Sequence, residues 1–158
     1  MSQRKPPVYL ISVLLFMLIL PIGSILIQWQ VSKMAMSWPL IGKWFVFWSV
    51  GVRLFIAGLR QVTKPAFTAK EIFHITGDES CVVIRELGFA NLCFGTLGIL
   101  SLFKPGWCQP AALAGGLYFG LAGILHVFKK PDSRNEVIAM VSDLYIFLLL
   151  VLYLIFTL

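Results

Sequence analysis

Five polar side chains that interrupt long apolar stretches are the residues best suited to do chemistry: Arg53, Glu86, Asn91, His126 and Asp143. An ionisable group within a membrane-length apolar segment is costly, so it needs either a partner or a role. Glu86, His126 and Asp143 are candidates for proton exchange, because histidine titrates near neutral pH and carboxylates change protonation on burial. With Arg53 and Asn91 they are also candidates for binding a ligand.

Other kinds of chemistry find less support in the sequence. The two histidines, His74 and His126, form neither HxxxH nor HExxH, although a haem held by both stays open as an alternative. The cysteines form no CxxC pair and are not expected to build a disulfide framework: they are Cys81, Cys93 and Cys108. No GxSxG motif occurs. We therefore predict no catalytic residue, no metal ligand and no tightly bound cofactor, and favour a protein that is not an enzyme.

Composition places these residues in a membrane. Of 158 residues, 59% are hydrophobic and 13% are charged, whereas soluble domains have about 45–50% apolar and about 25% charged residues. This excludes a soluble globular domain and a disordered chain. The net charge is +6, but no basic run is longer than Lys129-Lys130, so nucleic acid is not an expected partner.

Five apolar segments are long enough to span a bilayer, so the fold class expected is an all-α polytopic transmembrane bundle. They cover residues 8–27, 42–59, 81–103, 110–128 and 137–158. The first is expected to be a retained span and not a cleaved signal. We expect two parts: residues 1–41 with the first span and an outer loop, and residues 42–158 as a four-helix bundle with an inner-side loop at 60–80.

Within that loop, Thr68 and Glu71 have the spacing of a capping box ahead of Ile72. This predicts a short helix lying at the membrane surface.

Basic residues predict the orientation. With the N-terminus inside, the inner segments hold nine lysines and arginines and the outer segments hold three, namely Lys33, Lys43 and Lys104, with Arg53 inside a span. The positive-inside rule therefore predicts a cytoplasmic N-terminus and a periplasmic C-terminus. This topology places the five polar residues in the inner half of the bilayer, with Arg53 about 10 Å below the inner surface at 1.5 Å per residue.

Two interpretations of this inner-leaflet cluster stay open. In one, Arg53 pairs with Glu86 or Asp143, and Asn91 and His126 form hydrogen bonds between helices, so the cluster only holds the bundle together. In the other, the cluster lines a pocket for a quinone, a lipid head group or another small amphiphile.

Glycine stripes predict which helices meet. Gly88, Gly95 and Gly98 share one face of the third span with Asn91, and Gly116, Gly120 and Gly123 share one face of the fourth. Small residues allow helix backbones to approach closely in lipid. We expect the third and fourth spans to pack tightly, with Asn91 and His126 facing the interior.

Several short motifs resemble a known group of proteins. They are Arg53-x-x-x-Ala57-Gly58, then Glu86-Leu87-Gly88 with Gly95, then Ala111-Ala112 with Gly115-Gly116 and His126. Over residues 45–158 the chain resembles the DoxX-like small bacterial membrane proteins, which implies a four-helix bundle, with the first span as an addition. It resembles more closely an uncharacterised bacterial family with an RELGFANLxxG segment, here Arg85 to Gly95. The resemblance implies the bacterial inner membrane and a role linked to membrane oxidoreductase complexes.

The functional hypothesis is a non-catalytic accessory or assembly subunit of a larger membrane complex, a redox complex being one candidate. Its expected partners are membrane lipid and either a protein subunit or further copies of the chain. The alternative is a stand-alone binder or membrane enzyme that uses the inner-leaflet cluster to hold a quinone, lipid or small amphiphile. Proton or solute transport ranks third, because we find no inverted repeat with broken helices.

Overall fold

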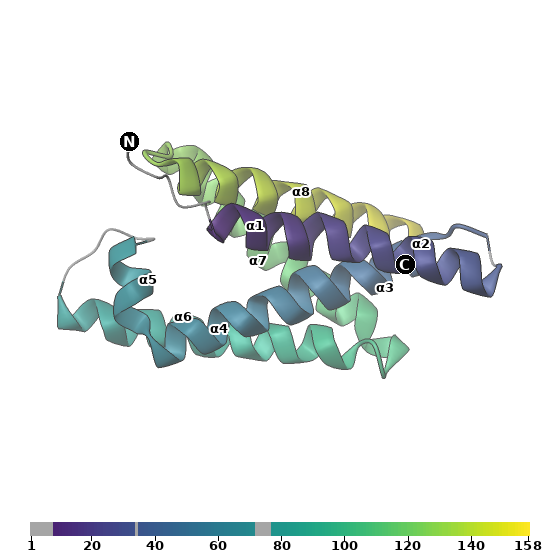
Figure 1. Ribbon diagram of the computed structural model, residues 1–158, viewed down its shortest axis with the longest axis horizontal. Coiled ribbons are helices and arrows are strands. Elements are labelled where there is room, and N and C mark those ends of the chain that lie inside the picture. The colour runs from purple at the N-terminus through teal and green to yellow at the C-terminus, as the bar shows by residue number, and fades with distance from the viewer. Residues whose placement is uncertain (1–7, 34, 72–76) are drawn as a thin grey trace.

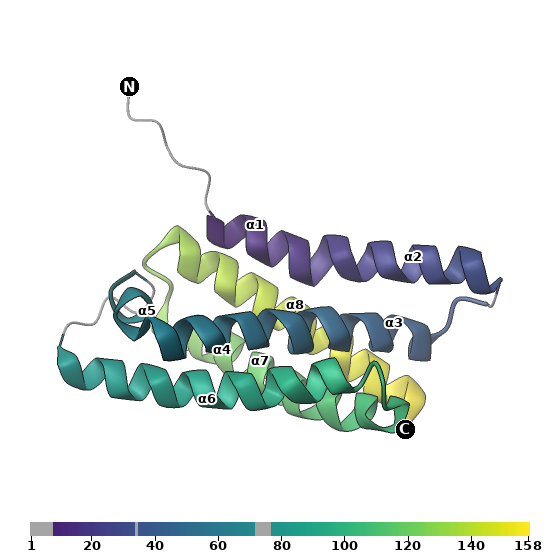
Figure 2. The same ribbon diagram turned by 60° about the horizontal axis from the view of Figure 1, so that its bottom comes forward.

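The computed structural model describes residues 8–33, 35–71 and 77–158, and the described elements are helices joined by short connections. Five helical segments are long and apolar enough to cross a membrane: Tyr9–Ser32, Trp38–Thr63, Glu79–Leu100, Pro105–Lys129 and Arg134–Thr157. They run alternately up and down, side by side (Figures 1 and 2). We name the two ends of the bundle the Lys129 end, where the first span begins, and the Lys104 end, where it finishes.

The first span contains a wide turn whose cause is a proline. It consists of α1 (Val8–Leu14), the π-helical turn η1 (Leu15–Ile19) and α2 (Leu20–Ser32). Pro21 has no N–H to donate, and in a regular α-helix its ring would collide with the preceding turn. The chain widens just before it, and the Leu20 N–H bonds to the Leu15 carbonyl five residues back. The proline is thus accommodated by a π turn within a continuous helix.

The second span also contains a π turn, which faces the first. It consists of α3 (Trp38–Phe45), η2 (Val46–Val52) and α4 (Arg53–Thr63), so it begins four residues before the expected Gly42. The buried Ser49 hydroxyl in η2 donates to the Phe16 carbonyl in η1 at 3.3 Å. A widened helix leaves carbonyls available for such bonds between spans.

The short surface helix lies earlier in the chain than the sequence indicated. Helix α5 covers Pro65–Glu71, with the proline at its first position, where a missing N–H costs nothing. Thr68 is a buried residue inside this helix, so it is not the N-cap that the capping-box prediction required. That prediction is therefore wrong for Thr68, and the residues from Ile72 to Ile75 lie outside the described part.

The last three spans are α6 (Asp78–Leu100), α7 (Cys108–Lys129) and α8 (Arg134–Thr157), with the single turn η3 (Pro105–Trp107) before α7. Together with the second span they form two closely packed pairs of helices, and the third and fourth spans are not one of these pairs. Helix α4 with η2 packs on α6, and α7 packs on α8, while α6 and α7 touch each other much less.

Glycines allow the helices to approach closely in both pairs. A Cβ added at Gly98 would lie 2.5 Å from the Gly51 nitrogen, and one at Gly95 would lie 2.5 Å from the Phe55 nitrogen, so α6 meets the second span backbone to backbone. On α7 the partner is α8: a Cβ at Gly120 would lie 2.7 Å from the Phe147 ring. The predicted tight packing of the third span on the fourth is wrong, because each glycine stripe faces a different helix.

The first span contributes to the same core as the others. Val13, Met17 and Ile25 are buried in one cluster with Val46 and Leu150, which lie on the second and fifth spans. The division into residues 1–41 and 42–158 stays a prediction, but the apolar interior is continuous across it.

Candidate functional site

An ion pair near the middle of the bundle brings together two of the five predicted site residues. The Arg53 Nη2 lies 3.7 Å from the Asp143 Oδ1, and their side chains are only 15% and 10% exposed. Arg53 begins α4 and lies ten residues before its end, and Asp143 lies nine residues into α8. At 1.5 Å per residue, both are about 15 Å from the Lys129 end, near the middle of a 30 Å hydrocarbon layer.

The surroundings of Arg53 come from four spans. Its guanidinium carbon lies 5.4 Å from the centre of the Phe119 ring of α7, an arrangement suited to a cation–π interaction. Tyr9 of α1 has its phenol beside the same guanidinium. The first, second, fourth and fifth spans therefore meet at one cation.

The pair is incompletely satisfied. The separation of 3.7 Å is longer than a hydrogen bond, and the buried Asp143 Oδ1 has no hydrogen-bond partner among the described residues. A buried ion pair recovers its desolvation cost only when further hydrogen bonds complete it. A carboxylate oxygen in this position can accept a proton donor from a small molecule or from water.

Asn91 joins a second polar contact, between α6 and α4. Its Nδ2 donates to the Gln61 Oε1 at 2.7 Å, while no residue in the described part of the chain forms a hydrogen bond with its buried Oδ1. The phenol of Tyr118, on α7, lies beside Asn91. Gln61 was not among the predicted site residues. The signal in the sequence was its position, one residue after Arg60 and on the same helical face as Gly58.

His126 and Glu86 occupy different surroundings. His126 is half-buried near the end of α7, close enough to both Asp143 and Glu136 to interact with them electrostatically. Glu86 is exposed on α6 and forms no ion pair with any residue that the structure describes. Of the two partners considered for Arg53, the structure shows Asp143 and not Glu86, so the expected cluster does not include Glu86.

The start of α8 carries a polar motif that the sequence analysis missed. The Ser133 hydroxyl accepts the Glu136 N–H at 3.2 Å, and the Glu136 carboxylate accepts the Asp132 N–H at 2.9 Å and lies 3.3 Å from the Lys129 ammonium. The signal was Ser133-x-x-Glu136 before an apolar run, the spacing of a capping box. This motif closes the connection between α7 and α8.

The chemistry open to these groups is binding and proton exchange. Among the described residues, no three His, Cys, Asp or Glu side chains gather as a metal ion would require. The hydroxyls of Ser49, Ser101 and Ser142 donate to backbone carbonyls and not to a base. His74 lies outside the described residues, so the alternative of a haem held by two histidines has no geometry to examine.

The five apolar helices and their interior ion pair define the class: an all-helical, multi-pass membrane protein. Within that class, residues 10–158 match the model of the Family of unknown function (DUF6790), and the chain belongs to this family. Neither the curated proteins nor the solved structures contain a match to the chain.

Proposed function

We propose that the protein is a non-catalytic accessory or assembly subunit of a larger complex in the bacterial inner membrane, with the N-terminus cytoplasmic and the C-terminus periplasmic. The observation that supports the proposal best is the outer face of α6. Six of its exposed residues recur at alternating intervals of four and three: Val82, Glu86, Phe89, Cys93, Thr96 and Leu100. This spacing places the six residues in one continuous row along the helix.

The composition of this face differs from that of the other spans. Away from their ends, the exposed positions of α7 and α8 are mostly bulky and apolar, as lipid contact favours: Leu113, Leu117, Leu121, Ile124, Val141, Leu148 and Leu152. The face of α6 instead includes a carboxylate, a thiol and a hydroxyl. Small and polar side chains are enriched where helices associate within membranes.

The proposed occupant is a transmembrane helix of a partner subunit that carries a basic residue near its cytoplasmic end. Charge complementarity is the reason: Glu86 is exposed near the Lys129 end, and none of the described residues neutralises it. A lysine or arginine of the partner at that level would pair with it, and Cys93 and Thr96 would allow the backbones to approach.

Thr96→Trp tests the docking face, with Leu121→Trp as the matched control on an exposed face of α7. Each variant is purified from its native membrane in mild detergent and examined by native mass spectrometry. We expect a defined heavier complex for the wild type and for Leu121→Trp, and its loss for Thr96→Trp. A wild-type protein that purifies alone, or two tryptophan variants that behave alike, contradicts the proposal.

The DoxX-like resemblance makes the proposal more specific. The four-helix core would then correspond to the second to fifth spans, and the complex would be a membrane oxidoreductase. The identity of the co-purified partner and its absorption spectrum test this part, because a redox complex carries a coloured cofactor.

A second candidate function is binding of a quinone, lipid or small amphiphile at the interior polar groups. Its support is two buried acceptor atoms, Asn91 Oδ1 and Asp143 Oδ1, to which none of the described residues donates a hydrogen bond. A quinol or a lipid hydroxyl would supply the missing hydrogen-bond donors. Mass spectrometry of an organic extract of the purified protein should find a retained small molecule that is absent from Asn91→Leu and present in Glu86→Gln, whose side chain lies outside the interior. Retention by Asn91→Leu would exclude this site.

A further inference from the structure

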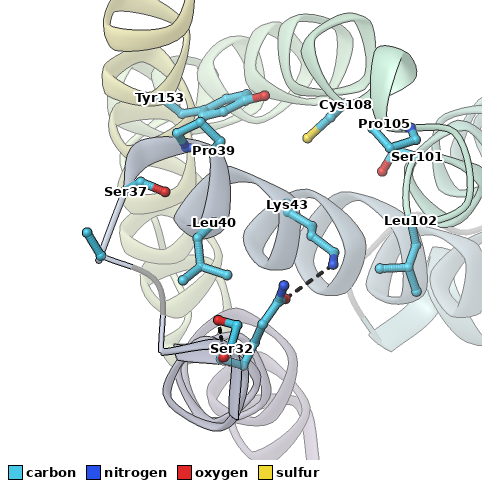
Figure 3. A pocket seen from close by; sticks show the side chains of 12 residues that line it. Ser32, Ser37, Pro39, Leu40, Lys43, Ser101, Leu102, Pro105, Cys108 and Tyr153 are labelled. Carbon is cyan, nitrogen blue, oxygen red and sulfur yellow. Dashed lines mark hydrogen bonds between the residues drawn. The ribbon is translucent and has the colours of Figure 1, made fainter. Parts of the chain in front are cut away.

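A cavity of about 300 Å³ lies at the Lys104 end, away from the interior ion pair. It is open on one side and is bordered by the end of α2, the start of α3, the turn after α6, the start of α7 and the last turns of α8. Figure 3 shows the Lys43 side chain extending into it, opposite Leu102, with Cys108 and Tyr153 on a further wall. Its volume is at the lower limit for small-molecule sites.

Lys43 gives this cavity a positive charge that its neighbours do not neutralise. The Lys43 Nζ donates to the Gln28 Oε1 at 3.2 Å, and the same oxygen accepts the Trp44 Nε1–H at 2.7 Å. An amide is neutral, so this bond orients the ammonium without cancelling its charge. No described carboxylate lies within ion-pair distance of Lys43.

The acidic residues of the sequence also leave the positive charge of Lys43 without a partner. The seven acidic residues are Glu71, Asp78, Glu79, Glu86, Asp132, Glu136 and Asp143, and none lies in the connections at the Lys104 end. The helix dipoles do not remove this charge, because the N-termini of α3 and α7 oppose two of the three C-termini at the cavity, those of α2, α6 and α8. The one C-terminus left over carries only about half a negative charge. Lys43 is therefore the dominant charge at the cavity.

The other walls combine apolar surface with hydroxyl groups. Leu40, Leu102 and the buried ring of Tyr153 provide the apolar part, and the hydroxyls of Ser32 and Ser37 provide the polar part. An ammonium has three protons to donate, and the Gln28 oxygen accepts one. A ligand that fits has one anionic head and an apolar body.

We propose that this cavity binds the phosphate head group of an anionic phospholipid from the leaflet at the Lys104 end. The ammonium of Lys43 would form a charge-assisted hydrogen bond to a phosphate oxygen. The acyl chains would lie against Leu40 and Leu102. Gln28 and Trp44 hold the Lys43 side chain in position before the lipid binds.

The test measures lipid retention by native mass spectrometry after exchange into detergent with phosphatidylglycerol, with phosphatidylcholine, or with inorganic phosphate alone. The wild type should retain phosphatidylglycerol preferentially. Lys43→Gln should weaken that retention at least about tenfold, which corresponds to about 1.4 kcal/mol, because the charge-assisted hydrogen bond to the phosphate is lost. Lys104→Gln removes the same charge from an exposed site at the same end, and should leave retention unchanged.

Two further comparisons separate the alternatives. Lys43→Arg keeps the charge and should keep the preference for phosphatidylglycerol. If Lys43→Gln loses lipid because it misfolds, its circular dichroism spectrum will show a loss of helix, whereas a specific loss of lipid leaves the spectrum unchanged. Equal retention by Lys43→Gln and the wild type, or equal retention of the two lipids, overturns the proposal. Displacement of the lipid by millimolar inorganic phosphate would mean that the site recognises a free anion, and would overturn the assignment to a lipid.

Discussion

The ion pair between Arg53 and Asp143 is the residue-scale feature with the largest expected effect on stability. Replacing one partner leaves the other charge buried and unpaired, which costs about 3–5 kcal/mol. Arg53→Met and Asp143→Leu should therefore each lower the midpoint of thermal unfolding in detergent, and the double variant should recover most of the loss.

Lys104→Met is the control for this cycle, because it removes a charge from an exposed position. Single variants that cost no more than this control would show that the Arg53–Asp143 pair does not stabilise the bundle. A double variant no better than the worse single one would show that the two residues act separately.

A smaller effect is expected at the start of α8. Ser133→Ala removes the hydroxyl that accepts the Glu136 N–H, and loss of an N-cap costs about 1 kcal/mol. Thr63→Ala is the comparison, because its exposed hydroxyl bonds only to the Leu59 carbonyl of its own helix. Hydrogen exchange at the first turn of α8 should accelerate in Ser133→Ala alone, and unchanged exchange there would contradict the capping role.

The sequence was informative about the depth of these residues. Counting residues from the basic ends placed Arg53 and Asp143 at similar depth, and the structure pairs them. The same counting placed Glu86 near the inner end of the third span, but depth does not predict which way a side chain points. Glu86 is on the exposed face of α6 and forms no ion pair with Arg53. Gly88 lies next to Gln61 and Val62, so Glu86 is level with the end of α4 and not deep in the bundle.

At the scale of elements, the glycines make a matched pair of tests possible. Gly98→Ala would bring a Cβ to 2.5 Å from the Gly51 backbone, and overpacking of this kind costs about 1–3 kcal/mol. Gly116→Ala meets Leu150 at 3.5 Å, an ordinary contact, and should be neutral or stabilising by about 0.4–1 kcal/mol. Unfolding in detergent measures both, and equal effects would contradict the close approach of α6 to η2.

The pairing of elements is what the sequence could not predict. The stripe formed by Gly88, Gly95 and Gly98 indicates that α6 has a close neighbour, but the spacing is the same whichever helix lies there. Between helices in lipid there is no hydrophobic preference for a neighbour, so the choice depends on the detailed shape of both faces. The sequence did not predict the π turns either. Pro21 indicated an irregularity in the first span, but within Val46–Val52 only Ser49 and Gly51 are distinctive.

At the scale of the whole molecule, the alternating spans place all the connections at two ends (Figure 2). In a background where Cys81, Cys93 and Cys108 are alanine, Asp132→Cys should be protected from a membrane-impermeant thiol reagent in intact spheroplasts. Gly106→Cys, at the exposed turn of the opposite end, should react. The reverse pattern would invert the proposed orientation, and reaction at both positions would contradict the membrane topology.

The contacts between α7 and α8 have a consequence for how the protein inserts into the membrane. These two helices pack closely on each other, their connection is fastened by Ser133, Glu136 and Lys129, and α7 makes little contact with α6. They therefore form a helical hairpin that can enter the bilayer as one unit after the preceding spans are in place. A gene divided within the 101–107 turn should yield two fragments that insert separately and reassemble.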